Sequence, residues 1–350
     1  AACCRPPVLL VHGFFADASE FVLNPPESSP GMILADTGFD VFLLNVRGTT
    51  FSQRHLNMTN DDPESWKFTM DEMAKYDATA AIDKALQLNG ASALYWIGHS
   101  QGTMLSFLML ADRPEYNAKV RAMFELTPAG RIHNTRGLTK LGFWIVNKLA
   151  PILSIYKMLF GSHEFGFRAP WFGGSLSRLV CSALNYEVRI TDALSETSFL
   201  NSQALSPVRN ERICELRRSR FPVYLSHLLV STSTWNFLHY GQHAAHESIL
   251  HFDASPAENM RRYGQINPPS YNFSNIDTDI YFFWSRNDWA TAPEEIEQWL
   301  IPHMGPGVIK GTFEHPEYSH LDFAVATDVA DRIFNVIVDI VREYETNACL

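Results

Sequence analysis

Cysteine is scarce in this sequence. Only 5 of the 350 residues are Cys, at positions 3, 4, 181, 214 and 349. The odd count and wide spacing match neither a zinc site nor a disulfide scaffold, so we expect the fold to rest on a hydrophobic core. Two interpretations stay open for Cys181 and Cys214: one disulfide in an oxidising compartment, or two buried thiols.

An excess of basic residues is also missing. Lys and Arg number 28 against 38 Asp and Glu, which gives a formal net charge of -10. A chain this acidic offers no face for binding phosphates, so we expect no nucleic-acid partner.

No hydrophobic run is long enough to span a bilayer. The best candidate, residues 141–160, is interrupted by Lys148, Pro151 and Lys157, so we expect no transmembrane segment. The chain also begins without a basic-then-apolar signal segment, which either was cleaved or lies outside this sequence.

Apolar runs alternate with helical segments at both ends of the chain. Residues 8–11, 41–46, 93–97 and 120–126 are predicted strands, and residues 70–88 and 103–111 are predicted helices. After residue 276 come strands at 280–284 and 308–313, a helix at 293–300 and one long final helix at 322–343. This order predicts an α/β fold with a mainly parallel sheet.

Residues 131–275 lack this alternation. They contain amphipathic segments at 137–160, 176–183 and 212–220, with many Gly, Pro and Ser between them. We interpret this stretch as a mostly helical cap, inserted into a core made of residues 1–130 and 276–350.

The segment Gly98-His99-Ser100-Gln101-Gly102 lies between the predicted strand 93–97 and the helix that follows. A strand–turn–helix is the setting in which this pattern forms a nucleophile elbow. Small residues at both ends of the pattern permit a tight, strained turn. We predict that Ser100 is a nucleophile; the alternative is an ordinary turn with a capping serine.

A serine hydroxyl needs a base and a third group that orients the base. In this fold the order along the chain is Ser, acid, His. Asp288 follows the strand 280–284, and His320 follows the strand 308–313. Asp279, Asp322, His303 and His315 are alternatives, although Asp279 opens its strand at the wrong end and Asp322 suits a helix start. We expect His99 to point away from Ser100.

An oxyanion hole requires backbone N–H donors. We predict that Gln101 supplies one and Phe14 the other, from the loop after the first strand. A generic turn is the alternative for His12-Gly13.

Longer motifs in the same chain resemble the animal acid lipase family, which includes gastric lipase and lysosomal acid lipase. They cover nearly the whole chain: LVHGF (10–14), ILADTGFDV (33–41), NVRG (45–48), DEMAKYD (71–77), GHSQGT (98–103), VYLSH (223–227), PPSYN (268–272) and HLDF (320–323). The variable phrase at 14–19 resembles invertebrate, nematode-like members.

The resemblance implies an α/β-hydrolase fold with a helical cap acting as a lid. It also implies serine-dependent hydrolysis of triacylglycerol or cholesteryl ester at a lipid–water interface, through an acyl-enzyme, without cofactor or metal. The triad carried over is Ser100, Asp288 and His320. Other classes open to the chain are a small-ester carboxylesterase or thioesterase, or a non-catalytic lipid-binding protein.

The family also implies a glycosylated, secreted or lysosomal protein, and two sequons begin at Asn57 and Asn272. Two features depart from the family. A strand hairpin normally precedes the His-Gly loop, and without it one sheet edge is expected to be uncovered. Cys181 matches the first of two neighbouring cap cysteines, but no second Cys follows at short range. The oligomeric state does not follow from the sequence.

Overall fold

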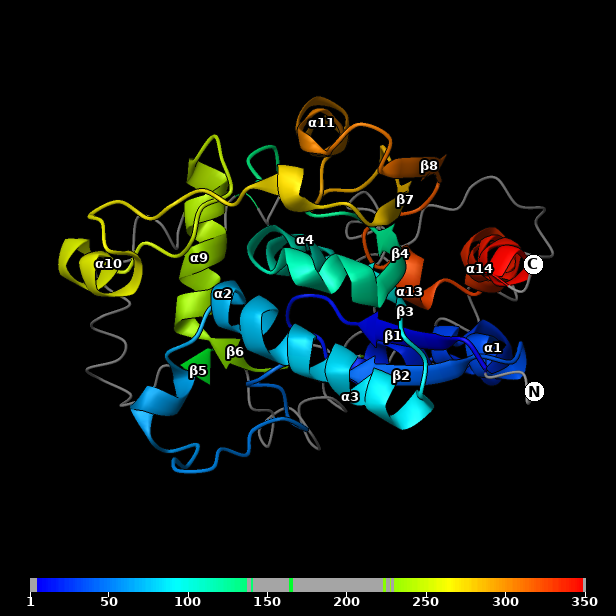
Figure 1. Cartoon of the computed structure of the whole chain (residues 1–350), viewed down its shortest axis with the longest axis horizontal. Helices are drawn as coiled ribbons and strands as arrows, with labels where there is room; N and C mark the ends of the chain where they lie inside the picture. The colour runs from blue at the N-terminus through cyan, green and yellow to red at the C-terminus, as the bar shows by residue number, and fades with distance from the viewer. Residues whose placement is uncertain are drawn as a thin grey trace, which may run out of the picture.

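Six parallel strands form the central sheet of this protein in the computed structural model, which describes residues 5–136, 140, 164–165, 223–224, 227 and 230–348. The strand order is β2-β1-β3-β4-β7-β8 (Figure 1). The strands are β1 (Pro7–Val11), β2 (Asp40–Leu44), β3 (Leu94–His99), β4 (Val120–Leu126), β7 (Asp279–Trp284) and β8 (Ile309–Glu314). The predicted α/β-hydrolase core with a parallel sheet is therefore confirmed.

Alternate strand residues face two separate hydrophobic clusters. Leu9 and Trp96 pack into one cluster, while Val8 and Tyr95 pack into the other. This is the period of two that a pleated strand imposes, and both faces are apolar because helices cover both. The predicted continuous apolar runs follow from this double burial.

Helices cover the two faces of the sheet. Met73 of η4 and Met104 of α4 belong to the first cluster, and Leu34 of α1 and Phe323 of α13 belong to the second. The helices of the first layer are α2 (Met70–Glu72), η4 (Met73–Ala78), α3 (Thr79–Asn89), α4 (Gln101–Asp112), α11 (Pro293–Glu295), η8 (Ile296–Leu300) and α12 (Ile301–His303). Those of the second are α1 (Pro30–Asp36), α13 (Asp322–Val325), η9 (Ala330–Phe334) and α14 (Asn335–Ala348). Short helical turns connect the core elements: η1 (Ala18–Val22), η2 (Pro26–Ser28), η3 (Pro63–Trp66), η5 (Pro114–Lys119) and η7 (Phe273–Asn275).

The prediction of one long final helix over 322–343 is wrong. α13 ends at Val325, and Ala326 is extended, with φ -65° and ψ 146°. Side chains from the other end of the chain bind the carbonyls that this break exposes: the Asn24 amide donates to Val325 O, and the Ser28 hydroxyl donates to Thr327 O. These contacts compete with helix continuation, and no local pattern announces them.

Most of the predicted cap, and all five cysteines including Cys181 and Cys214, lie outside the described residues. The described part includes a two-stranded antiparallel pair, β5 (Glu164–Phe165) and β6 (Thr232–Ser233), followed by α9 (Thr234–Ala245), α10 (Pro256–Tyr263) and the short turn η7. In Figure 1, α9 and α10 stand beside one end of the sheet, on the side away from α1 and α14. The boundaries 131 and 275 of the cap stay a prediction.

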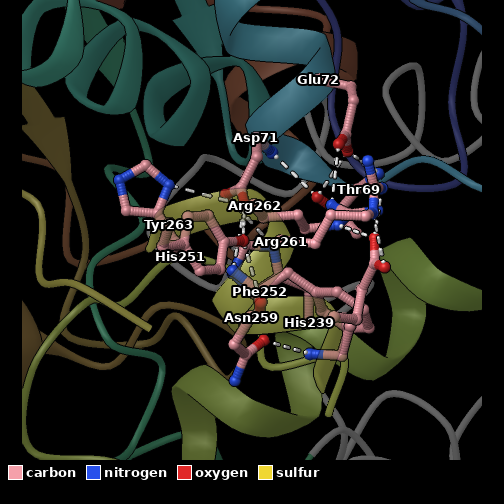
Figure 2. A network of polar contacts seen from close by, with 12 residues as sticks. Thr69, Asp71, Glu72, His239, His251, Phe252, Asn259, Arg261, Arg262 and Tyr263 are labelled. Atoms are coloured by element: carbon pink, nitrogen blue, oxygen red, sulfur yellow. Dashed lines mark hydrogen bonds and ion pairs between the residues drawn. The ribbon is translucent and has the colours of Figure 1, made fainter. Parts of the chain in front are cut away.

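A network of polar contacts fastens the segment after α9 to the core (Figure 2). The Asp71 carboxylate of α2 accepts hydrogen bonds from Phe252 N at 2.9 Å and from Tyr271 Oη at 2.6 Å. His239 and His251 lie 3.8 and 3.6 Å from the same carboxylate. One acidic side chain of the core therefore joins three stretches of the later chain.

Among the residues that the structure describes, no helix combines the length and the hydrophobicity needed to cross a bilayer.

Candidate active site

Ser100 occupies a strained turn between β3 and α4. Its φ is 51° and its ψ is -110°, a conformation that L-residues rarely adopt. The glycines of the motif are needed for steric reasons. A Cβ atom added to Gly102 would lie 2.1 Å from Val11 O, and one added to Gly98 would lie 2.7 Å from the carbonyl carbon of Gly102. The turn therefore projects Ser100 while α4 packs directly against β1.

Three predicted side chains meet at this turn. Nε2 of His320 lies 2.8 Å from Oγ of Ser100, and Nδ1 of His320 lies 2.9 Å from Oδ2 of Asp288. Asp288 follows β7 and His320 follows β8, so residues separated by 188 and 32 positions converge at the carboxyl ends of neighbouring parallel strands. The arrangement has the geometry of an activated nucleophile, with a base and a group that orients the base.

The Asp288 carboxylate is almost wholly buried and saturated with donors. It accepts hydrogen bonds from Ala290 N at 2.8 Å, from Thr291 N at 3.0 Å and from Thr291 Oγ1 at 2.7 Å. Burial alone would raise the pKa of Asp288, but His320 and the Thr291 donors outweigh it and lower that pKa. An ionised carboxylate at Nδ1 would leave Nε2 of the imidazole free to accept a proton from Ser100.

The alternative acids and bases make other contacts. Asp279 pairs with Lys310 at 3.3 Å, and Asp322 accepts hydrogen bonds from Ser319 N and Oγ at 2.8 Å. Nδ1 of His303 lies 2.7 Å from the carbonyl of Trp299. Burial lowers the pKa of His315 to about 4, and its ring stacks on Phe283 and Tyr318.

The loop after β1 lies against Ser100. A Cβ atom added to Gly13 would lie 3.4 Å from the Cβ of Ser100, so Phe14 follows directly on the residue that touches the elbow. His12 stabilises this loop from within: Val46 N donates to its Nε2 at 3.3 Å, which leaves Nδ1–H to donate to Gly13 O at 2.9 Å. Burial lowers the pKa of His12, in keeping with this neutral form.

The second predicted oxyanion donor, Gln101, is the first residue of α4. Its N–H belongs to the helix start, where backbone donors lack acceptors within the helix. Its side chain accepts a hydrogen bond from Nδ2 of Asn236 in α9 at 2.9 Å. Sequence reasoning did not single out Asn236, because only the packing of α9 brings it to the elbow.

Three aromatic rings pack together at the loop that follows β1. The Phe14 ring lies 4.4 Å from the ring of Tyr240 and 5.8 Å from that of Phe237, both on α9. Together these rings form an aromatic wall on the loop after β1.

Glu20 is a further residue that sequence reasoning missed. It is 5% exposed, and its Oε1 lies 2.6 Å from Nδ1 of His99, the residue before the nucleophile. Its other oxygen accepts the N–H of Gly13 at 2.8 Å. The other ring nitrogen of His99, Nε2, lies 3.0 Å from the carbonyl of His320. The loop that follows Phe14 also carries Asp17 and Ser19, so nothing in the local sequence distinguishes Glu20.

The profile of the α/β hydrolase fold family matches residues 6–138. Over 339 residues the chain is 32% identical to lipase lipl-1 of Caenorhabditis elegans, covering 97% of this chain and 80% of that protein. It is 33% identical over 341 residues to gastric triacylglycerol lipase of Bos taurus, with coverage of 97% and 80%. The chain belongs to the animal acid lipase family. This lipase is a carboxylic ester hydrolase, as the sequence predicted.

Solved structures agree on the fold. A soluble variant of monoglyceride lipase from Saccharomyces cerevisiae superposes with a TM-score of 0.51 and 14% identity, covering 97% of this chain and 86% of that one. At that identity the likeness concerns only the fold.

Proposed function

We propose that this lipase hydrolyses long-chain neutral lipid esters, triacylglycerol or cholesteryl ester, with Ser100 as nucleophile, His320 as general base and Asp288 as the group that orients the base. The observation that carries the proposal is the pair of contacts made by the His320 ring, 2.8 Å to Ser100 Oγ and 2.9 Å to Asp288 Oδ2. Each ring nitrogen thereby has the partner that its role requires.

The proposed reaction has two stages. His320 Nε2 takes the proton of Ser100 while Oγ bonds to the ester carbonyl carbon, and the carbonyl oxygen becomes an oxyanion facing the N–H groups of Phe14 and Gln101. The C–O bond to the alcohol then breaks as His320 returns the proton to the leaving oxygen. Water, deprotonated by His320, attacks the acyl-enzyme and releases the fatty acid and Ser100.

The aromatic wall supports a lipid substrate. The half-buried rings of Phe14 and Phe237 lie 5.8 Å apart beside one proposed oxyanion donor, so an acyl chain bound there would bury hydrocarbon against rings. Gln101 is linked to α9 through Asn236, so the proposed lid region and the oxyanion hole are in direct contact. Opening of that region at a lipid–water interface would expose both together.

The roles are tested with Ser100→Ala. We expect hydrolysis of p-nitrophenyl butyrate to fall by at least about 10³-fold, and labelling by a fluorophosphonate to disappear, while thermal unfolding is unchanged. A Ser100→Ala protein that kept the parental rate would overturn the assignment. The exposed variant Ser92→Ala serves as control.

The substrate class is tested by chain length. A lipase of this kind prefers long acyl chains and gains activity when the substrate forms an emulsion. We expect higher specific activity on emulsified triolein than on monomeric tributyrin below its solubility limit. A preference for the soluble short ester would instead assign the protein to the small-ester carboxylesterases, and no turnover with either would assign it to lipid binding.

We further propose that this lipase is a glycosylated protein of the secretory or lysosomal route. Both sequon asparagines, Asn57 and Asn272, are exposed, and an accessible side-chain amide is what glycosylation requires. Removal of N-glycans from protein made in animal cells should lower its apparent mass. The proposal would be overturned if glycan removal left the gel mobility of the parent unchanged and the double variant Asn57→Gln/Asn272→Gln migrated like the parent.

A further inference from the structure

One buried chain of contacts connects the two loops that flank the nucleophile. It begins at Gly13 N–H, passes through the Glu20 carboxylate to Nδ1 of His99, and ends where His99 Nε2 meets the carbonyl of His320 at 3.0 Å. His99 is 1% exposed and Glu20 5% exposed, so water does not compete for these groups. One end is therefore Gly13, which precedes the proposed oxyanion donor Phe14, and the other is the backbone of the proposed general base, His320.

The number of protons shared by Glu20 and the His99 ring follows from their neighbours. Both ring nitrogens of His99 face oxygen atoms, one of a carboxylate and one of a carbonyl. A neutral imidazole carries a single N–H, so one more proton must lie between Glu20 and His99. Burial alone would lower the pKa of His99, but Glu20 outweighs it and raises that pKa. Burial would likewise raise the pKa of Glu20, and His99 reverses this. The proton therefore resides on the imidazole, as a buried ion pair.

The His320 backbone is what this ion pair contacts, and its position sets how far Nε2 reaches toward Ser100. The same ion pair restrains Gly13, whose successor Phe14 carries a proposed oxyanion donor. Small displacements matter here, because a misplacement of about 1 Å costs on the order of 10²-fold in rate.

We propose that Glu20 and His99 are positioning residues for the ester hydrolysis: their buried contact holds the Phe14 loop and the His320 loop in register on either side of Ser100. This proposal rests on the proposed function, since it assigns a role to residues behind the same site. Neither side chain touches the reacting atoms.

Two variants of Glu20 distinguish the effect of its side-chain length (its reach) from the effect of its charge. Glu20→Gln keeps the length: its oxygen can accept from Gly13 N–H, and its amide can donate to Nδ1 of a neutral His99, whose Nε2–H still reaches His320 O. Glu20→Asp keeps the charge but is one methylene shorter, so it cannot bridge both partners. Positioning requires reach, so Glu20→Gln should lose no more than about threefold in kcat, and Glu20→Asp about 10- to 100-fold.

The measurement is kcat and KM for soluble p-nitrophenyl butyrate, with the rate of fluorophosphonate labelling. We expect the Glu20→Asp loss to fall on kcat, with KM within about twofold, and labelling to slow in parallel. The exposed Glu27→Gln and Glu27→Asp are matched controls and should match the parent. Urea unfolding of each variant confirms that the folded protein is being assayed.

Other outcomes overturn the proposal. Parental kcat in both Glu20 variants would make the ion pair a packing feature only. An active Glu20→Asp with an inactive Glu20→Gln would make the charge, and not the reach, the property that matters. A failure of the proposed function is seen separately, because Ser100→Ala would then retain activity whatever the Glu20 variants do.

Discussion

The carboxyl group of Glu125 lies against the glycine that opens the nucleophile turn, since a Cβ atom added to Gly98 would be 2.6 Å from Oε2 of Glu125. Glu125 is wholly buried in β4. Its Oε1 accepts a hydrogen bond from Ser106 Oγ at 2.6 Å, and its Oε2 has no hydrogen-bond partner among the described residues. Burial raises the pKa of Glu125 well above its ordinary value, so this acid stays protonated beneath the site.

Glu125→Gln should change how stability depends on pH. In the parent, the folded state holds a proton that the unfolded chain releases above about pH 4.5, so the stability of the parent falls as pH rises toward the raised folded pKa. Glutamine has no such proton. We expect equal free energies of unfolding near pH 4, and a Glu125→Gln advantage that grows by up to about 1.4 kcal/mol per pH unit above pH 5.

Urea unfolding of the Glu125→Gln and parent proteins at pH 4.5, 6 and 7.5 measures this difference. The exposed Glu27→Gln is the control and should show none. A constant gap between parent and Glu125→Gln at all three pH values would contradict the prediction.

Asp288→Asn should remove most activity with little effect on folding. The amide would donate to His320 Nδ1 and so force the proton onto Nε2, the atom that has to accept the proton of Ser100. We expect kcat for p-nitrophenyl butyrate to fall by about 10³- to 10⁴-fold. The exposed Asp331→Asn is the control, and a loss below tenfold in Asp288→Asn would rule out this role.

Asp71→Asn should weaken the attachment of the segment after α9 (Figure 2). Burial alone would raise the pKa of Asp71, but His239 and His251 lower it far below the usual range, so its contribution is present above about pH 4. Burial alone would lower the pKa of His251, but Asp112 and Asp71 raise it to about 9. The contribution of His251 is complete below about pH 6.5 and is lost as pH rises through 9.

The ion pair of Asp71 and His251 therefore stabilises the fold most between about pH 4 and 6.5. We expect Asp71→Asn to lose about 3 kcal/mol of unfolding free energy at pH 5.5, and less at pH 9.5, where His251 is neutral in both proteins. Urea unfolding at the two pH values measures this, with the exposed Asp61→Asn as control. If Asp71→Asn lost the same unfolding free energy at pH 5.5 and at pH 9.5, the ion pair with His251 would not be the source of the loss.

Gly102→Ala should destabilise the whole core. The new Cβ would lie 2.1 Å from the carbonyl oxygen of Val11, so α4 or β1 has to move and the elbow moves with it. We expect a loss of about 3 kcal/mol, together with loss of activity. The nearest neighbour of a Cβ at Gly305 is 3.6 Å away, so Gly305→Ala should stay within about 1 kcal/mol of the parent. Equal stability of the two variants would argue against this packing.

Much of the core could be predicted because parallel strands covered on both faces are apolar runs. The strand at 120–126 was predicted with the bounds that β4 has, while the run at 41–46 overshot β2 by two residues. The final helix was predicted as continuous because its break depends on Asn24 and Ser28, some 300 residues away. Local pattern cannot detect a competitor that only folding brings near.

The sequence by itself determined the fold class, the family and the serine, acid and histidine to test. This was possible because the succession of strands and helices along the chain and the turn at Ser100 are local features of the sequence. The tertiary structure decided which other residues contact the site and its flanking loops. It placed Glu20 against His99, Asn236 against Gln101 and Glu125 against Gly98. Burial keeps Glu125 protonated, whereas His99 outweighs burial and keeps Glu20 ionised. The cost of a buried charge depends on neighbours that are distant in sequence.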